Sequence, residues 1–228
     1  PPPPPPPPPP PFFFFKQTRE YAIRLSLVGS EMCIRDSAMR ARLSLVISKT
    51  RVEIREVYLK EKPKEFLASS ISATVPCMVT HEKILDESLD IMLWVLKKND
   101  PQNWLKMPKI GFDLIKENDG PFKKYLDKTK YHTRYPEINP EESRKKASVF
   151  LSKLENMMDE NYLFGPYPSV ADMAILPFIR QFANTDFEWF EKQNWPNVKK
   201  WLNTFIGSEI FNLIQIKYDK WTNLSKPQ

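Results

Sequence analysis

Glycine, cysteine and histidine are all scarce in this chain, and each scarcity argues against one kind of site. Five glycines among 228 residues leave no glycine-rich loop that could cradle a phosphate. The two cysteines, Cys33 and Cys77, indicate no disulfide framework and favour a reducing compartment, so we expect a cytoplasmic protein. The two histidines, His81 and His132, have no partners at ligand spacing, and we therefore expect no metal site.

Long apolar runs and charge blocks are also missing. No segment reaches the roughly 18 apolar residues of a membrane span, so we expect no membrane association. The formal net charge of +6 comes from 34 Lys and Arg against 28 Asp and Glu, and no basic cluster is interleaved with aromatic residues. This pattern is typical of a solvated mixed surface, and we expect no nucleic-acid partner.

Residues 1–37 differ in character from the rest of the chain. Residues 1–11 are all proline and 12–15 all phenylalanine, a low-complexity pattern that could form a polyproline II ligand with an aromatic tail. Residues 16–37, above all 27–37, instead resemble a translated sequencing-library adapter fused to a truncated gene. We therefore predict that residues 1–37 are an artefact and exclude them from functional interpretation.

Residues 38–103 predict alternating helices and strands, whereas residues 104–228 predict helices and loops. In the first stretch Met39, Leu43 and Val46 have the spacing of an amphipathic helix. The further elements expected there are a strand over 52–57, a short helix from 62, strands over 77–79 and 83–85, and a helix over 87–98. In the second stretch we expect a helix capped by Asn139, with the Glu142 side chain bonding back to the backbone of Asn139. We also expect a capping box over 169–172 and an apolar run over 173–179.

A proline at the start of a strand is the most informative local feature. Pro76 cannot donate a ladder hydrogen bond, so we place it at the first residue of the strand. If the bond between Val75 and Pro76 is cis, the N–H and C=O groups of Val75 face outward, where an extended peptide-like ligand could pair with them. Asp86 can cap the following helix, whose first turn, with Glu87 and Ser88, offers free amides to a carboxylate.

The order of these features resembles the glutathione-binding half of a glutathione transferase. The residues that carry the resemblance are Lys62-Pro63, then Thr74-Val75-Pro76, then Glu87-Ser88 entering an apolar helix. The similarity runs from Ala38 to near the C-terminus, and residues 59–63 are most similar to the omega-like and bacterial cysteine-type branches.

The resemblance implies an α/β plus all-α fold. A thioredoxin-like N-terminal domain would span residues 38–103, and a helical-bundle C-terminal domain would span residues 104–228. The family's first strand, an interior one, is missing or replaced here. We predict that Arg24 to Val28, which alternate and are largely apolar, take its place between residues 52–57 and 77–79.

The resemblance also implies roles for five residues in binding glutathione as cosubstrate. Val75, set by Pro76, would pair with the cysteinyl backbone of glutathione. Ser88 would take its γ-glutamyl carboxylate, and Glu87 its ammonium group. Lys62 would reach the glycine carboxylate, the alternative being a solvated lysine.

The nucleophile that the cysteine-type branch carries is absent from its expected place. In that branch a Cys-Pro-Tyr or Cys-Pro-Phe step precedes the first helix, where the helix dipole lowers the thiol pKa. Here the positions read Arg35-Asp36-Ser37, and we expect no catalytic residue among them. Ser37 is a weak candidate, its alternative being a helix cap. We interpret Cys77 as a buried structural thiol and assign Cys33 no role.

Two aromatic residues of the second half are candidates for an electrophile pocket. By resemblance, Phe122 and Tyr125 would contact the substrate, although ordinary packing is an equal alternative.

We therefore interpret the chain as a glutathione-dependent transferase or thiol transferase whose activity is impaired by the lost nucleophile. Its partners would be glutathione and a small hydrophobic electrophile or a mixed disulfide, and a homodimer is possible. The alternative is a non-catalytic binding or regulatory protein with the same fold.

Overall fold

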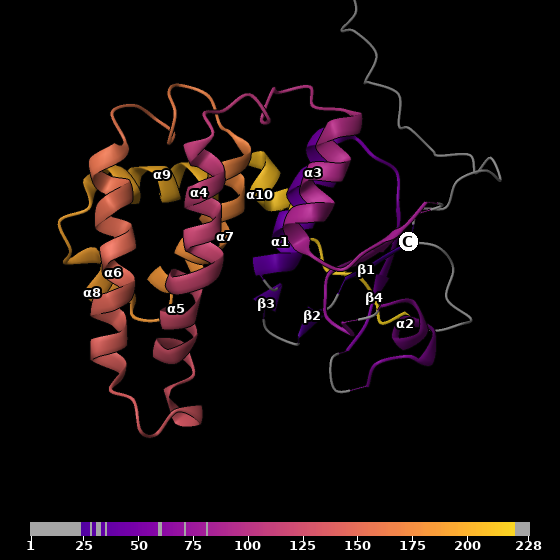
Figure 1. Cartoon of the computed structure of the whole chain (residues 1–228), viewed down its shortest axis with the longest axis horizontal. Coiled ribbons are helices and arrows are strands. Elements are labelled where there is room, and N and C mark those ends of the chain that lie inside the picture. Colours follow the sequence, from indigo (N-terminus) through magenta and orange to yellow (C-terminus); the bar gives the residue numbers. More distant parts are fainter. Residues whose placement is uncertain are drawn as a thin grey trace, which may run out of the picture.

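The computed structural model describes the backbone of residues 24–27, 29–30 and 33–34 together with residues 36–58, 61–70, 72–80 and 82–221. The first half alternates strands and helices as predicted, and the second half is helical (Figure 1). The first half consists of β1 (Arg24–Leu27), β2 (Gly29–Ser30), β3 (Cys33–Ile34), α1 (Asp36–Ser48), β4 (Glu53–Glu56), α2 (Lys64–Ser69), β5 (Cys77–Val79), β6 (Ile84–Leu85) and α3 (Ser88–Lys98). The second half consists of α4 (Ile110–Glu117), the π-helix η1 (Asn118–Phe122), α5 (Lys123–Lys130), the 3-10 helix η2 (His132–Arg134), α6 (Pro140–Met157), α7 (Val170–Ala183), α8 (Phe187–Glu191), α9 (Pro196–Ile206) and α10 (Glu209–Ile214).

The sheet has the order β4-β1-β5-β6, with β1 in its interior. β1 runs parallel to β4 and antiparallel to β5, so that Leu25 lies opposite Ile54 on one side and Met78 on the other. This confirms the predicted pairing of the segment from Arg24 with both neighbouring strands, although Val28 lies outside the described residues. The sheet order is that of the expected thioredoxin-like domain.

The two faces of the sheet are covered by different helices. Successive residues of a strand point to opposite faces, and in β5 Met78 joins the main core that contains α1 and α3. Its neighbours Cys77 and Val79 instead pack with Phe66 of α2. Figure 1 shows α1 and α3 side by side and α2 at a distance from both.

Helix α1 is buried on nearly all sides. Ala38, Met39, Ala41 and Leu43 are fully buried, and α1 packs against α3 as well as against α7 and α10 of the second half. The prediction of a helix here is confirmed, but the expected exposed polar face is absent from this described helix. The reason is its position between the sheet and the helical half, which leaves no face to solvent.

Arg40 joins α1 to the helical half. Its guanidinium donates to both carboxylate oxygens of Asp119, at 3.0 and 2.5 Å, and to the carbonyl of Ala174 at 2.6 Å. It also lies 4.4 Å from the ring centroid of Phe178. Since only 2% of Arg40 is exposed, these contacts replace the water that the charge gave up.

Arg42 joins α1 to the C-terminal segment and to β4. It donates to the carbonyls of Ile214 and Ile216 at 3.0 and 2.6 Å, and to the buried carboxylate of Glu56 at 3.2 Å. The segment after α10 then pairs with β4, because Trp221 N–H donates to the Glu56 carbonyl at 2.7 Å. The C-terminal segment therefore pairs with β4 at its last residue, Glu56.

The helical half is organised around α7. This helix is buried along most of its length, as the apolar run predicted, and the predicted capping box is present between Ser169 and Asp172. The Asp172 carboxylate also accepts from the N–H of Leu163 at 2.9 Å and from the indole N–H of Trp201 at 3.0 Å. One buried carboxylate thus connects the start of α7 to α9 and to the preceding loop.

The start of α6 is capped as expected in one respect only. The Asn139 side chain accepts from the N–H groups of Glu141 and Glu142 at 2.8 and 3.4 Å, and Pro140 takes the first helical position. The Glu142 carboxylate, expected to return a bond to Asn139, pairs instead with Lys146 at 2.8 Å. The prediction of a reciprocal bond there was wrong because a lysine one turn later is a stronger partner.

Arg42→Met is expected to destabilise the protein by about 3 kcal/mol or more, because it leaves the Glu56 carboxylate buried without its cation. Urea unfolding of the full chain measures this loss. Adding Glu56→Gln should recover part of it. The control Lys123→Met breaks the exposed Lys123–Asp127 pair and should change stability by at most about 0.5 kcal/mol. Equal losses in the two methionine variants would contradict this prediction.

Stability is expected to fall as the pH rises from 5 to 8, in part because of Glu56. Burial raises the pKa of Glu56 from 4.5 to about 7, against the opposing effect of Arg42. Between pH 4.5 and 7 Glu56 keeps its proton in the folded state but has lost it in the unfolded state. The stabilisation that this proton contributes is therefore complete below about pH 4.5, and it is lost as the pH rises through 7. The expected change is on the order of 2 kcal/mol. In Glu56→Gln this part of the pH dependence should disappear from unfolding curves, and an unchanged profile would refute it.

Candidate functional site

The bond between Val75 and Pro76 is cis, and β5 begins at the next residue, Cys77. Val75 and Pro76 are both buried. Within the described part of the chain, neither the N–H nor the carbonyl of Val75 has a hydrogen-bond partner. The predicted cis bond is therefore present, although the strand begins one residue after Pro76 and not at Pro76 itself.

Asp86 fixes the loop that leads to this bond. Its carboxylate accepts from the Ser70 hydroxyl at 2.8 Å and from the Ser72 N–H at 3.1 Å. The prediction that Asp86 caps α3 was wrong: Glu87 occupies the cap position and no side chain caps the helix. The carboxylate is directed across to the loop instead. Asp86 thereby brings the start of α3 next to the loop before Val75, and we call residues 70, 72–76 and 86–88 the binding corner.

The other predicted glutathione-binding residues lie in or near the binding corner. Glu87 is exposed, and Ser88 begins α3 with 6% of its surface exposed. The first amides of α3 lack intrahelical partners, as at any helix start. Lys62 lies just before Pro63, the cap residue of α2, and is partly buried. No hydrogen bond joins Lys62 to the binding corner among the residues described.

The start of α1 presents a buried carboxylate. Asp36 is 5% exposed, and burial raises its pKa to about 7 even though Lys130, Arg180 and Arg40 oppose the shift. Ser37 is the second residue of the helix, partly buried, and so does not hold the cap position that was its expected alternative.

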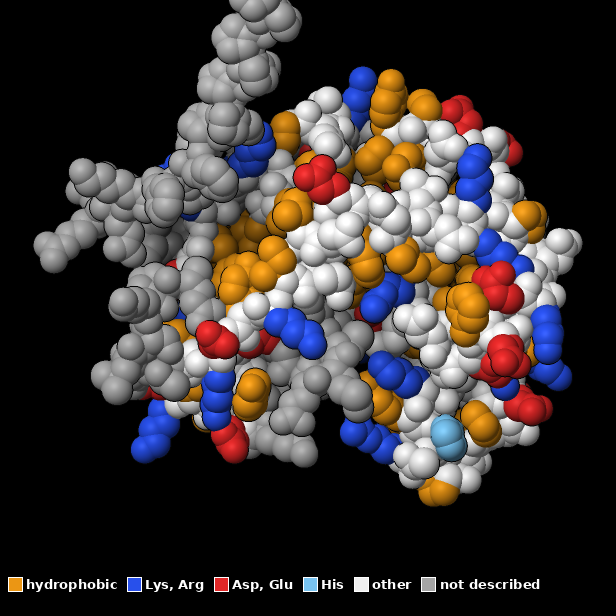
Figure 2. All heavy atoms as spheres, turned by 180° about the vertical axis from the view of Figure 1, so that it is seen from behind, with side chains coloured by type: hydrophobic (Ala, Val, Ile, Leu, Met, Phe, Trp, Pro, Cys, Tyr) orange, Lys and Arg blue, Asp and Glu red, His pale blue; other side chains and the backbone are white. Residues whose placement is uncertain are grey.

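Sequence reasoning missed two cations that oppose the raised pKa of Asp36. Lys130 ends α5 and Arg180 lies in α7, both far from α1 along the chain. The excess of basic residues over 123–134 was the one available signal. Figure 2 shows basic side chains near the single visible histidine, at the lower edge of the helical half.

The two aromatic candidates lie in the helical half, Phe122 at the end of η1 and Tyr125 in α5. Phe122 is 1% exposed, with ring centroids 5.0 and 5.8 Å from those of Phe150 and Phe182. It is a core residue of the described structure, which favours the packing alternative. Tyr125 is partly buried and faces α6, where the Lys146 ammonium lies 5.8 Å from its ring centroid.

Cys77 is a buried thiol of low reactivity. Burial, with the nearby Asp86 carboxylate, raises its pKa to about 12, although the Ser70 hydroxyl opposes the shift. A thiol this hard to ionise is a poor nucleophile at neutral pH. The side chain of Cys33 lies outside the described residues.

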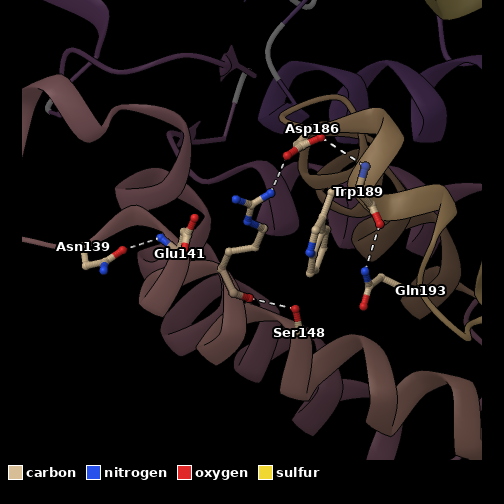
Figure 3. A network of polar contacts seen from close by, with 7 residues as sticks. Asn139, Glu141, Ser148, Asp186, Trp189 and Gln193 are labelled. Atoms are coloured by element: carbon tan, nitrogen blue, oxygen red, sulfur yellow. Dashed lines mark hydrogen bonds and ion pairs between the residues drawn. The ribbon is translucent and has the colours of Figure 1, made fainter.

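No cluster of three metal-ligating side chains was found in the described ranges, and no helix there could cross a membrane. His132 is exposed in η2, and His81 lies outside the described residues. A hollow of about 410 Å³ lies between α6 and α8. There Arg144 donates to Asp186 at 2.5 Å and stacks 4.8 Å from the centroid of Trp189 (Figure 3). These internal contacts engage the guanidinium, and the hollow is therefore a weaker candidate than the binding corner.

Comparison with protein families matches both halves of the chain. The N-terminal domain of glutathione S-transferases matches residues 31–104, and their C-terminal domain matches residues 94–209. No curated protein sequence gave a match.

Solved structures share the fold at low sequence identity. A glutathione S-transferase from Xanthobacter autotrophicus Py2 has a TM-score of 0.65 at 19% identity, covering 84% of this chain and 97% of that one. Glutathione transferase Omega 3C from Trametes versicolor has a TM-score of 0.67 at 15% identity, covering 86% and 90%. A Gtt2-class glutathione S-transferase from Vibrio parahaemolyticus has a TM-score of 0.66 at 18% identity, covering 84% and 98%.

Cys77 is expected to react with iodoacetamide at least about a hundredfold more slowly than a free thiol at pH 7.4, because so little of it is thiolate. Peptide-resolved mass spectrometry separates its labelling from that of Cys33. Asp86→Asn should speed the labelling of Cys77, since it removes the adjacent negative charge. Ser148→Ala, a distant hydroxyl on α6, serves as the control. Rapid labelling of Cys77 in the unchanged folded chain would overturn this expectation.

Proposed function

Because the chain belongs to the glutathione S-transferase family, we propose that it binds glutathione at the binding corner and acts as a glutathione-dependent transferase or thiol transferase. The observation that carries this proposal is the corner itself. Asp86 connects a helix start to a loop that ends in a cis peptide bond, and the backbone of Val75 has no partner among the described residues.

Each end of glutathione has a chemically suited group in this arrangement. The N–H and carbonyl of Val75 would pair with the cysteinyl unit as an added strand. The amides at the start of α3 and the Ser88 hydroxyl would hold the γ-glutamyl carboxylate, and the exposed Glu87 carboxylate would hold its ammonium group. Lys62 would approach the glycine carboxylate. Together these contacts would orient the glutathione sulfur toward the start of α1.

The chemistry proposed is thiol exchange or thiol addition at that sulfur. In an intact cysteine-type parent, a thiolate at the start of α1 would attack the glutathionyl sulfur of a mixed disulfide, and the substrate thiolate would leave. Ordinary electrophiles would accept the glutathione thiolate directly. In this chain the positions of the Cys-Pro-Tyr sequence hold Arg35, Asp36 and Ser37 instead. We therefore expect glutathione to bind but to be turned over slowly.

Several further properties belong to this proposal. We place the protein in the cytoplasm, and we expect glutathione and a small electrophile or mixed disulfide as its ligands, with a homodimer as the possible assembly. We retain the boundary near Asn103 between the two domains, and the adapter-like origin of residues 1–37.

Calorimetric titration of glutathione into the full chain tests the binding site. The double variant Glu87→Ala with Ser88→Ala should weaken binding at least about tenfold, because a charged contact and a hydrogen bond are both removed. Glu82→Ala removes an exposed carboxylate five residues earlier and should leave the affinity unchanged. Equal affinity in the double variant and the unchanged chain would show that glutathione does not bind at Glu87 and Ser88.

Turnover then separates an enzyme from a binding protein. A chain with Arg35→Cys, Asp36→Pro and Ser37→Tyr should reduce a glutathione mixed disulfide at least about tenfold faster than the unchanged chain. Binding without any gain in rate would favour the regulatory alternative.

A further inference from the structure

The short helix α2 is anchored in the protein by one buried side chain. Phe66 is the buried residue of α2, and the other residues of the helix are exposed or partly buried. Phe66 belongs to a small cluster with Val57, Val75 and Cys77, which is separate from the main core. The position of α2 therefore depends on what packs around Phe66.

This helix lies between two parts of the proposed glutathione site. Lys62 comes just before α2, and Ser70, whose hydroxyl donates to Asp86 at 2.8 Å, comes directly after it. Val75 shares the cluster of Phe66, but it is also joined through Pro76 to strand β5. A displacement of α2 would therefore move Lys62 more than it would move Val75.

The C-terminal end of the described chain reaches α2, as the yellow segment in Figure 1 shows. Trp221 N–H donates to the carbonyl of Glu56 at 2.7 Å, and the Arg55 guanidinium lies 4.5 Å from the Trp221 ring centroid. Trp221 also borders a cavity of about 20 Å³ whose other walls are Arg55, Val57, Glu65, Phe66, Ser69 and Val79. A cavity of this size has room for about one water molecule. Trp221 thus forms one wall of the packing around Phe66.

Neighbouring contacts of the C-terminal segment hold Trp221 in this place. The Lys220 ammonium pairs with the carboxylate of Glu61, the residue before Lys62. At the other end of the segment, Arg42 of α1 donates to two backbone carbonyls. The segment therefore connects α1 to the chain that enters α2 as well as to the side of Phe66.

We propose that Trp221 is a positioning residue for glutathione, because its packing beside Phe66 fixes α2, and with it Lys62, where the glycine end of glutathione binds. This inference rests on the proposed function, which assigns that end to Lys62. Trp221 itself contacts no ligand and acts through α2. A helix already fixed before binding does not have to be ordered by the ligand, and affinity is higher for that reason.

Glutathione and γ-glutamylcysteine test this role, because the second compound lacks only the glycine. In Trp221→Ala, calorimetry should show the affinity for glutathione reduced about tenfold, since α2 would hold its binding position for only part of the time. The affinity for γ-glutamylcysteine should change by less than about threefold, because its groups meet Val75, Glu87 and Ser88 instead. An unchanged affinity for glutathione, or an equal loss for both compounds, would overturn the proposal.

Three further variants identify the route of the effect. Trp221→Phe keeps an aromatic wall and should retain most of the affinity for glutathione. Tyr167→Ala removes an aromatic ring that is 78% exposed, and it should leave both affinities unchanged. In a chain that already carries Lys62→Met, adding Trp221→Ala should weaken glutathione binding by about twofold or less, because the two residues act on the same contact. A full additional loss there would contradict the route through Lys62.

Hydrogen exchange measures the hold on α2 without any ligand. The amides of Leu67 and Ser70, which donate to Pro63 and Phe66, should exchange at least about fivefold faster in Trp221→Ala, whereas those of α3 should not change. Tyr167→Ala again serves as the control. Unchanged exchange in α2 would refute the positioning role whether or not glutathione binds. Faster exchange, with neither compound binding to the unchanged chain, would instead refute the proposed glutathione site and leave only the hold of Trp221 on α2.

Discussion

The burial of α1 between the sheet and the helical half is the constraint on which the other parts of the structure depend. A helix with no exposed face must satisfy every polar side chain internally, and α1 carries two arginines among its apolar residues. Arg40 is bonded to the rod formed by α4, η1 and α5, whereas Arg42 is bonded to the C-terminal segment. Both bonds cross between parts far apart in sequence. The two halves therefore share one core and are expected to unfold together.

The fold could be predicted from the sequence to a large extent, because local patterns and a resemblance agreed. The proline at the start of β5, the capping box at Ser169 and the apolar run of α7 all depend on neighbouring residues. The insertion of Arg24–Leu27 as an interior strand was also predictable, since a sheet with a missing interior strand leaves an apolar gap that an alternating segment can fill.

The parts of the site that depend on long-range contacts could not be predicted. Asp86 is of a residue type that often caps helices. Only the positions of Ser70 and Ser72 explain why its carboxylate bonds to the loop instead. Phe122 looks like a pocket residue until its neighbours in α6 and α7 enclose it. Lys130 and Arg180 belong to different helices, and they act on the pKa of Asp36 only in the folded chain. In each case the deciding partner is more than ten residues away.

The π-helix Asn118–Phe122 lies within a continuous rod from α4 to α5, and a π-turn holds one residue more than an α-turn. That extra residue rotates the following helix by about 100° relative to an uninterrupted α-helix. Forming a π-turn lets a helix accommodate the insertion of a single residue without ending. Asp119, within this π-turn, is the residue that bonds Arg40 of α1. A sequence alignment of this rod with relatives that lack the π-turn would need a one-residue gap inside the helix. Without that gap, the aligned side chains beyond the π-turn would lie on different faces of the helix.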